Sequence, residues 1–163
     1  MKIINELKQE MILYYAGDAK RIQHFLKVHS FSKLIGECEG LVGDTLFILE
    51  AAALLHDIGI KPAERLYGSC SGKLQEELGP APARKMLKNL GLDINIIDRI
   101  CFLIAHHHTY TNVQGEDYQI LIEADFLVNL YEEDASEDAI KTALKNIFHT
   151  DTGTKICKAM FKV

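Results

Sequence analysis

Proline is scarce in this sequence, and long apolar runs are missing from it. The chain of 163 residues has three prolines, Pro62, Pro80 and Pro82, and all three fall within one stretch. Because proline disrupts the interior of a helix, its absence elsewhere leaves long segments free to be helical. No apolar run approaches the roughly 20 residues of a membrane span, and Glu50 interrupts the longest run. The sequence therefore predicts no transmembrane helix and no membrane partner.

Paired cysteines and an excess of positive charge are also missing. None of the four cysteines forms a Cys-x-x-Cys pair, which argues against a zinc ribbon or a redox motif. We expect four reduced thiols: Cys38, Cys70, Cys101 and Cys157. The net charge is -5, so the chain lacks the basic footprint of a non-specific nucleic-acid-binding protein. The first residues lack the apolar segment of a signal peptide, and we expect a cytoplasmic protein.

Apolar residues recur at three- and four-residue spacing along most of the chain, which is the pattern of amphipathic helices. With a length that suits one domain, this pattern predicts an all-α fold, a compact single-domain bundle of about seven to nine helices. We expect helices over residues 2–15, 18–39, 44–57, 79–91, 93 to 106 or 107, 117–132 and 137–148, and a short last one from Thr152 or Thr154. Residues 58–78 are the least regular stretch and are predicted to form a functional loop.

Polar residues that bind metals interrupt the apolar face of several predicted helices. His24 continues an apolar stripe, His56 and Asp57 end an apolar helix, and Asp125 lies at the centre of another stripe. Burying an unpaired carboxylate costs several kcal/mol or forces its protonation. A divalent cation among these side chains would remove that penalty. His24 is better placed for this role than His29, which lies at the margin of the same helix face.

Each of these residues also has an ordinary structural interpretation. An inward histidine is more often a hydrogen-bonded core residue than a ligand, Asp57 can be a solvated helix end, and Asp125 can pair with an arginine or a lysine. Taken together, they predict one site of two imidazoles and two carboxylates: His24, His56, Asp57 and Asp125. Mixed nitrogen and oxygen ligation suits Fe, Mn, Mg or Zn, and the sequence does not choose among them.

These residues, in this order, resemble the HD superfamily of metal-dependent phosphohydrolases. The matching pieces are Arg21-Ile22-x-His24, Leu54-Leu55-His56-Asp57-Ile58-Gly59, Ile104-x-His106-His107 and Glu123-Ala124-Asp125. The resemblance implies one HD-type domain over residues 1–163, with a motif core at 18–130 and C-terminal helices at 136–162 packing on it. It also implies that the metal lies between the central helices and is held by His24, His56, Asp57 and Asp125.

The resemblance further implies hydrolysis of a phosphate ester or anhydride in a small phosphorylated metabolite, and we expect that metabolite to be a nucleotide. A divalent ion activates the water in such chemistry, and Asp57 is expected to orient or deprotonate this water. The further catalytic candidates are His106, His107 and Lys61. Basic side chains hold the phosphate charge, and Arg21, Lys61 and Lys73 are the candidates for binding it. Ordinary surface charge is the alternative role for these basic residues.

A departure from the family pattern bears on a second metal ion. Two-metal members of the family carry a further histidine just before a glycine-initiated helix, where this chain has Gln75. Glu76 beside it can substitute as a ligand and, with His106 and His107, build a second site. We therefore expect one or two divalent ions per chain. No Gly-Tyr-Pro follows the histidine run, which argues against the cyclic-dinucleotide phosphodiesterase branch.

Other functions are compatible with the same residues. The missing histidine motivates a metal- or nucleotide-binding module without turnover, and a purely structural helical domain would bind no metal at all. The expected partner is a small phosphorylated molecule, and the chain can also form a homodimer.

Overall fold

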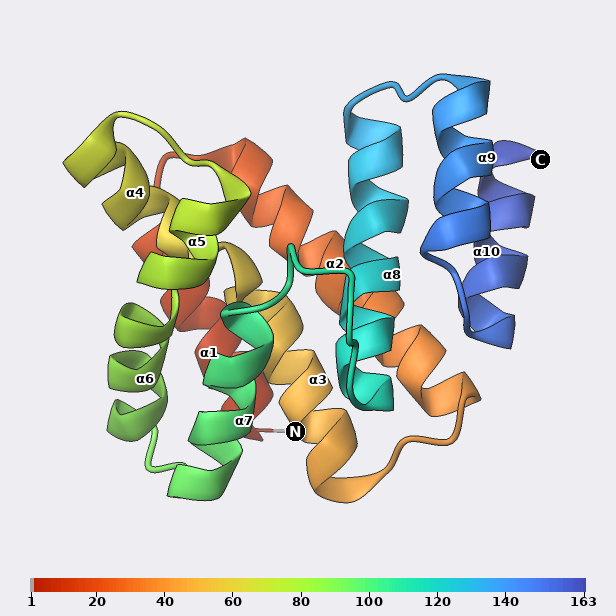
Figure 1. The fold of residues 1–163 in the computed structure, drawn as a ribbon. Helices are drawn as coiled ribbons and strands as arrows, with labels where there is room; N and C mark the ends of the chain where they lie inside the picture. Colours follow the sequence, from red (N-terminus) through yellow and green to blue (C-terminus); the bar gives the residue numbers. More distant parts are fainter. Residues whose placement is uncertain (1) are drawn as a thin grey trace.

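The computed structural model describes residues 2–163, and its regular elements within this range are all helical (Figure 1). Met1, the first residue of the expected domain, lies outside the described residues. The helices are α1 (Lys2–Tyr14), α2 (Ala19–Cys38), α3 (Gly43–Leu55), η1 (His56–Gly59), α4 (Ile60–Tyr67), α5 (Gly72–Leu78), α6 (Pro80–Asn89), α7 (Ile94–Ile104), α8 (Glu116–Glu132), α9 (Glu137–Asn146) and α10 (Asp151–Phe161). The predicted all-α fold is confirmed.

Helix α3 forms the centre of the molecule. Its residues from Ile48 to Leu55 are all buried, and α1, α2, α7 and α8 pack around it. A helix that is apolar on every side belongs in the interior of a protein. A cavity-forming change such as Leu54→Ala is therefore expected to cost roughly 2–5 kcal/mol of stability.

Short polar residues cap the later helices. Asp93 accepts a hydrogen bond from the Asn95 amide at the start of α7, and Ser136 accepts one from the Ala139 amide at the start of α9. Thr150 caps α10, so this helix begins earlier than the expected start at Thr152 or Thr154. Such caps contribute about 1 kcal/mol each, because they satisfy amides that the helix itself leaves unpaired.

The expectation of a loop at 58–78 was wrong, because this segment is mostly helical. Gly68 ends α4 with a φ of 63°, and Pro62 lies in the first turn of α4, where a missing amide hydrogen costs no helical bond. Gly59 allows close packing, since a Cβ there would lie 2.5 Å from the carbonyl oxygen of Gln75. Gly68 and Pro62 thus mark the two ends of a helix, and Gly59 marks a close contact. Helices α4 and α5 were not expected, and with them the described residues form ten α-helices.

The elements around the candidate site come from distant parts of the chain. Helices α2 and α8 pack against each other and against α3, and α5 packs on η1 at the carboxyl end of α3. Helix α10 packs on α8 and α9 and lies on the right of Figure 1, in blue. No helix within residues 2–163 combines the length and the apolarity needed to cross a membrane.

Candidate metal centre

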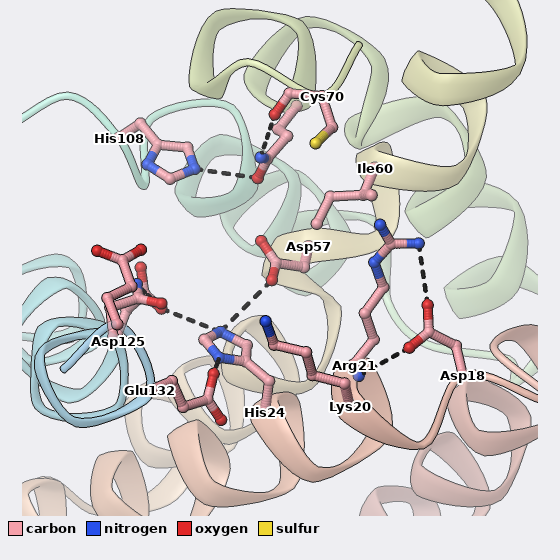
Figure 2. Close-up of a pocket in the computed structure, with 13 residues that line it drawn as sticks. Asp18, Lys20, Arg21, His24, Asp57, Ile60, Cys70, His108, Asp125 and Glu132 are labelled. Atoms are coloured by element: carbon pink, nitrogen blue, oxygen red, sulfur yellow. Dashed lines mark hydrogen bonds and ion pairs between the residues drawn. The ribbon is translucent and has the colours of Figure 1, made fainter. Parts of the chain in front are cut away.

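Four predicted ligands meet where α2, η1 and α8 come together. His24 extends from α2, His56 and Asp57 from η1, and Asp125 from α8. His24 Nε2 lies 3.2 Å from His56 Nε2, 3.2 Å from Asp125 Oδ1 and 3.4 Å from Asp57 Oδ2. Figure 2 shows His24 facing both carboxylates. The exposed fractions of His24, His56 and Asp125 are 7%, 0% and 3%, so these polar groups need compensation.

The spacing of these atoms fits a shared cation. His56 Nε2 lies 3.4 Å from Asp57 Oδ2 and 3.5 Å from Asp125 Oδ1. Neighbouring donors that share one ion at about 2.1 Å lie about 3.0–3.4 Å apart. Two imidazoles and two carboxylates are a suitable donor set for a divalent transition metal or magnesium. The arrangement therefore has the composition and approximate spacing of a metal centre.

The histidine rings present their Nε2 atoms to this centre. Nδ1 of His56 donates to the Ala53 carbonyl at 2.9 Å, and Nδ1 of His107 donates to the Ile104 carbonyl at 2.7 Å. A neutral ring that donates through Nδ1 keeps a lone pair at Nε2. His107 Nε2 is buried without a hydrogen-bond partner and lies 3.7 Å from Asp57 Oδ1. An orphaned lone pair beside a carboxylate is the geometry that a cation or a donated proton completes.

Asp57 belongs to two groups of side chains that could hold a metal ion. Its partners are His24 and His56 in one group and His107 and His108 in the other. Within each group one donor atom per residue lies within 4.8 Å of the others. Asp57 therefore lies between two candidate positions, which is compatible with one or two ions.

The electrostatics of the cluster favour positive charge. Burial lowers the pKa of His56, but Asp57 and Asp125 outweigh it and raise that pKa well above its usual value. Burial also lowers the pKa of His24, and the same two carboxylates again reverse the direction. Burial raises the pKa of Asp57 and of Asp125, but the facing histidines outweigh burial and hold both pKa values below their usual range. Ionised carboxylates thus attract either protons or a metal cation to this site.

A cavity of about 420 Å³ opens onto the cluster (Figure 2). This volume lies within the usual range of small-molecule pockets, roughly 300–1,000 Å³. Besides members of the cluster, its wall includes Asp18, Lys20, Arg21, Ile60, Cys70, Gln75, His108, Asn129, Glu132 and Glu133. Eight of these ten side chains are polar or charged, so the cavity can accept a hydrophilic ligand.

Of the predicted phosphate-binding residues, only Arg21 lines this cavity. Its guanidinium already pairs with Glu64 at 2.5 and 3.1 Å and with Asp18 at 3.1 Å, so part of its charge is neutralised. Lys20 also lines the cavity, and in Figure 2 it extends into the space between His24 and Arg21. Lys20 was not among the residues predicted from the sequence.

Two other predicted basic residues lie elsewhere. Lys61 Nζ donates to the Tyr14 carbonyl at 2.7 Å and lies 4.9 Å from the centre of the Tyr14 ring. Lys73 is exposed on α5 and is not part of the cavity wall. The structure therefore brings neither lysine to the metal centre.

His106 and Glu76 do not join the cluster either. The His106 ring stacks on Phe102, with the ring centres 4.2 Å apart, and its Nδ1 donates to the Phe102 carbonyl at 2.7 Å. Glu76 Oε1 accepts hydrogen bonds from the His108 amide and the Thr109 hydroxyl, both at 2.9 Å. Glu76 thus anchors the turn that carries the histidines, and the second group consists of Asp57, His107 and His108 instead.

His108 and Glu132 were missed for different reasons. Helix α7 ends at Ile104 and the histidine run forms a turn, so helical extrapolation past that point misplaced the rings. Glu132 contacts His24 Nδ1 at 2.9 Å. It follows Asp125 by seven residues on the same helix, a spacing that returns to the same face. That periodicity could have revealed Glu132.

The expectation for His29 was wrong. His29 is 5% exposed and is not at a margin; its Nε2 lies 2.9 Å from Glu50 Oε2 on α3. Helix α2 packs against both α3 and α8, so two of its faces are buried and each contains a histidine.

Comparison with known proteins decides the family. The chain matches the HD domain family model over residues 21–151. It belongs to the HD domain family. The matched range of this HD domain contains all the residues of the metal centre, including His24, His56, Asp57 and Asp125.

Solved structures support the same assignment of the HD domain. A predicted HD superfamily hydrolase from an uncultured Thermotogales bacterium is 26% identical, with 99% of this chain and 84% of that chain covered and a TM-score of 0.66. YpgQ of Bacillus subtilis is 16% identical over 99% of this chain and 87% of its own, with a TM-score of 0.70. At that identity the second likeness shows the shared fold. A search of curated proteins found no match.

Proposed function

We propose that this HD domain is a metal-dependent phosphohydrolase. Its substrate would be a phosphate ester or anhydride of a small phosphorylated metabolite, and we expect a nucleotide. The observation that carries the proposal is the convergence of imidazole Nε2 atoms and two carboxylates on an open polar cavity. Similarity to a predicted HD superfamily hydrolase supports it.

The chain's own residues suit this chemistry. When bound, a divalent ion supplies Lewis acidity and lowers the pKa of water. His24, His56, Asp57 and Asp125 would hold the ion. Asp57 Oδ1 points toward His107 Nε2 at 3.7 Å, so these two atoms can orient a water or accept its proton. His107 Nε2 has the lone pair for that role, because Nδ1 of the same ring donates its hydrogen to the Ile104 carbonyl.

Phosphate charge would be held at the α2 side of the cavity. Lys20 and Arg21 lie on this wall, one turn before His24. Because Arg21 is shared with Glu64 and Asp18, Lys20 would contribute more of the attraction. Fixed positive charge near the phosphoryl oxygens stabilises the transition state of phosphoryl transfer.

A metal-binding module without turnover is the second candidate. The observation in its favour is Gln75, whose Oε1 lies 3.0 Å from His108 Nε2 while its Nε2 donates to the Cys70 carbonyl. An amide that engages His108 in this way competes with a second ion. Saturable phosphate-ester binding without product release would support this candidate.

The test compares metal-loaded wild type with His56→Ala and Asp125→Ala on a panel of nucleotides and other phosphate esters. Asp98→Asn is a matched control, because Asp98 pairs with Arg84 on the surface. We expect turnover in wild type and the control and its loss in both site variants. Equal turnover in all four proteins would contradict the proposal. Elemental analysis of protein purified without added metal distinguishes both candidates from a purely structural domain.

A further inference from the structure

The ring of His24 is oriented differently from those of His56 and His107. His56 and His107 donate Nδ1–H to backbone carbonyls of their own segments, at Ala53 and Ile104. The Nδ1 partner of His24 is instead Glu132 Oε2, at 2.9 Å. Local backbone geometry therefore sets the first two rings, whereas a side chain from α8 sets the third.

Glu132 is itself held in place. Lys27 Nζ donates to its second oxygen, Oε1, at 2.9 Å, and the exposed fraction of the Glu132 side chain is 14%. Lys27 lies on α2, three residues after His24, and its ammonium is 5.8 Å from the ring centre of Tyr131. Both carboxylate oxygens are thus engaged by α2, one by the imidazole and one by the ammonium (Figure 2 shows Glu132 below His24).

Helix α8 supplies both a predicted metal ligand, Asp125, and the partner of His24 Nδ1, Glu132. Asp125 and Glu132 are seven residues apart on α8, so both face α2. Asp125 Oδ1 lies 3.2 Å from His24 Nε2, and Glu132 Oε2 lies 2.9 Å from His24 Nδ1. Both ring nitrogens of His24 therefore contact carboxylates of the same helix, α8. A carboxylate that accepts Nδ1–H fixes the tautomer and the ring and makes Nε2 a stronger ligand.

We propose that Glu132, held by Lys27, is a positioning residue that orients His24 and sets the affinity of the centre for a divalent ion. This inference rests on the proposed function only in requiring that the centre binds an ion. It predicts that changes at Glu132 weaken ion binding directly, apart from any effect on turnover.

The experiment titrates metal-free protein with Mn²⁺ alone and measures the dissociation constant by calorimetry. Glu132→Ala is expected to weaken Mn²⁺ binding by about 10–100-fold, the usual effect of removing such a partner. Glu132→Gln keeps an acceptor oxygen for Nδ1–H and is expected to restore part of the affinity. Lys27→Met should fall between wild type and Glu132→Ala.

Glu50→Gln is the matched control, because Glu50 pairs with a histidine of the same helix at the same distance, 2.9 Å, outside the centre. It should lower the melting temperature and leave the Mn²⁺ dissociation constant at the wild-type value. Wild-type affinity in Glu132→Ala would overturn the inference, as would equal weakening in Glu50→Gln and Glu132→Ala. If wild type binds no Mn²⁺, both the inference and the proposed function fail; if it binds Mn²⁺ with the predicted pattern but hydrolyses no phosphate ester, only the proposed function fails.

Discussion

Helix α2 carries two histidine–carboxylate pairs, and only one of them belongs to the candidate metal centre. His24 pairs with Glu132 and His29 with Glu50, each at 2.9 Å. Both histidines are buried. The pairs differ in the ring nitrogen that the carboxylate engages. Glu132 engages Nδ1 and leaves Nε2 for the cluster, whereas Glu50 engages Nε2, the atom that His24 presents to its neighbours.

The surroundings of the two pairs reinforce this difference. Burial lowers the pKa of His29, and the nearby charge of Lys8 lowers it further despite Glu50. At His24 the carboxylates of Asp57 and Asp125 outweigh burial and raise the pKa. A buried histidine beside one carboxylate therefore forms a core pair, whereas one that faces two further carboxylates has the surroundings of a metal ligand. The predictions below test this contrast.

The largest effect is expected from removing a ligand. His56→Ala should abolish metal binding and lower turnover at least ~10³-fold, equivalent to about 4 kcal/mol. His29→Ala should keep the metal content of wild type, because its ring faces Glu50 and not the cluster. Metal analysis of both purified variants checks this. Metal loss in His29→Ala would break the contrast.

His29→Ala should instead lower the stability of the fold. His29→Ala removes the hydrogen bond of the imidazole to the buried Glu50 carboxylate and leaves that carboxylate only Lys33, at 3.6 Å. The free energy of unfolding should therefore fall by about 3 kcal/mol, and the melting temperature by roughly 6–12 °C. Replacing both His29 and Glu50 by leucine should recover most of this loss, because no charge is then left buried. Urea unfolding of wild type, His29→Ala and the double variant measures the free energy of unfolding. A double variant no more stable than His29→Ala would show that the buried Glu50 carboxylate does not cause the loss.

A smaller effect is expected from the two neighbouring histidines His106 and His107, in the turn after α7. His107→Ala removes the buried Nε2 that faces Asp57 and should lower kcat about 10²-fold. His106→Ala removes a ring that stacks on Phe102 and should cost about 1 kcal/mol of stability, with kcat unchanged. Steady-state kinetics on metal-loaded proteins checks this pair. If His106→Ala is the more impaired enzyme, the assignment of the second group is wrong.

The smallest effect concerns pH. The pKa of His29 is lowered in the folded protein, so below about pH 6.5, its ordinary value, the unfolded chain binds more protons than the native one. The free energy of unfolding should therefore fall as pH falls, by at most about 1.4 kcal/mol per pH unit from this group. His24 and His56 have raised pKa values, and their contribution is lost as pH rises instead.

Comparison with His29→Gln isolates the His29 contribution, because the other histidines are common to both proteins. Urea unfolding of metal-free protein between pH 7 and 5 should show a shallower loss of stability in the variant. Parallel pH dependence in the two proteins would show that His29 does not titrate as the structure implies.

The parts of the fold that could be predicted are those with a strong local signal. Three-and-four spacing was enough for most helices, and the centre of the α8 stripe identified Asp125 as an anomaly in an apolar surface. Residues 58–78 were misjudged, because glycines and prolines that serve helix ends there have the same local preference as loop residues. The turn after Ile104 was misjudged because nothing in the three consecutive histidines shows where the helix stops.

Sequence alone predicted the helical class, an apolar helix at residues 44–57 and the ordered candidate set His24, His56, Asp57 and Asp125, since periodicity and residue chemistry are local properties. Tertiary structure decided which nitrogen of each ring faces the cluster, and that Glu132 supports His24 while Glu50 pairs with His29. It also placed His107 and His108 beside Asp57 and left His106 on Phe102. The pairs that join different helices depend on how α2, α3, α7, α8 and η1 pack, because the positions of the two partners along the chain do not show that they meet.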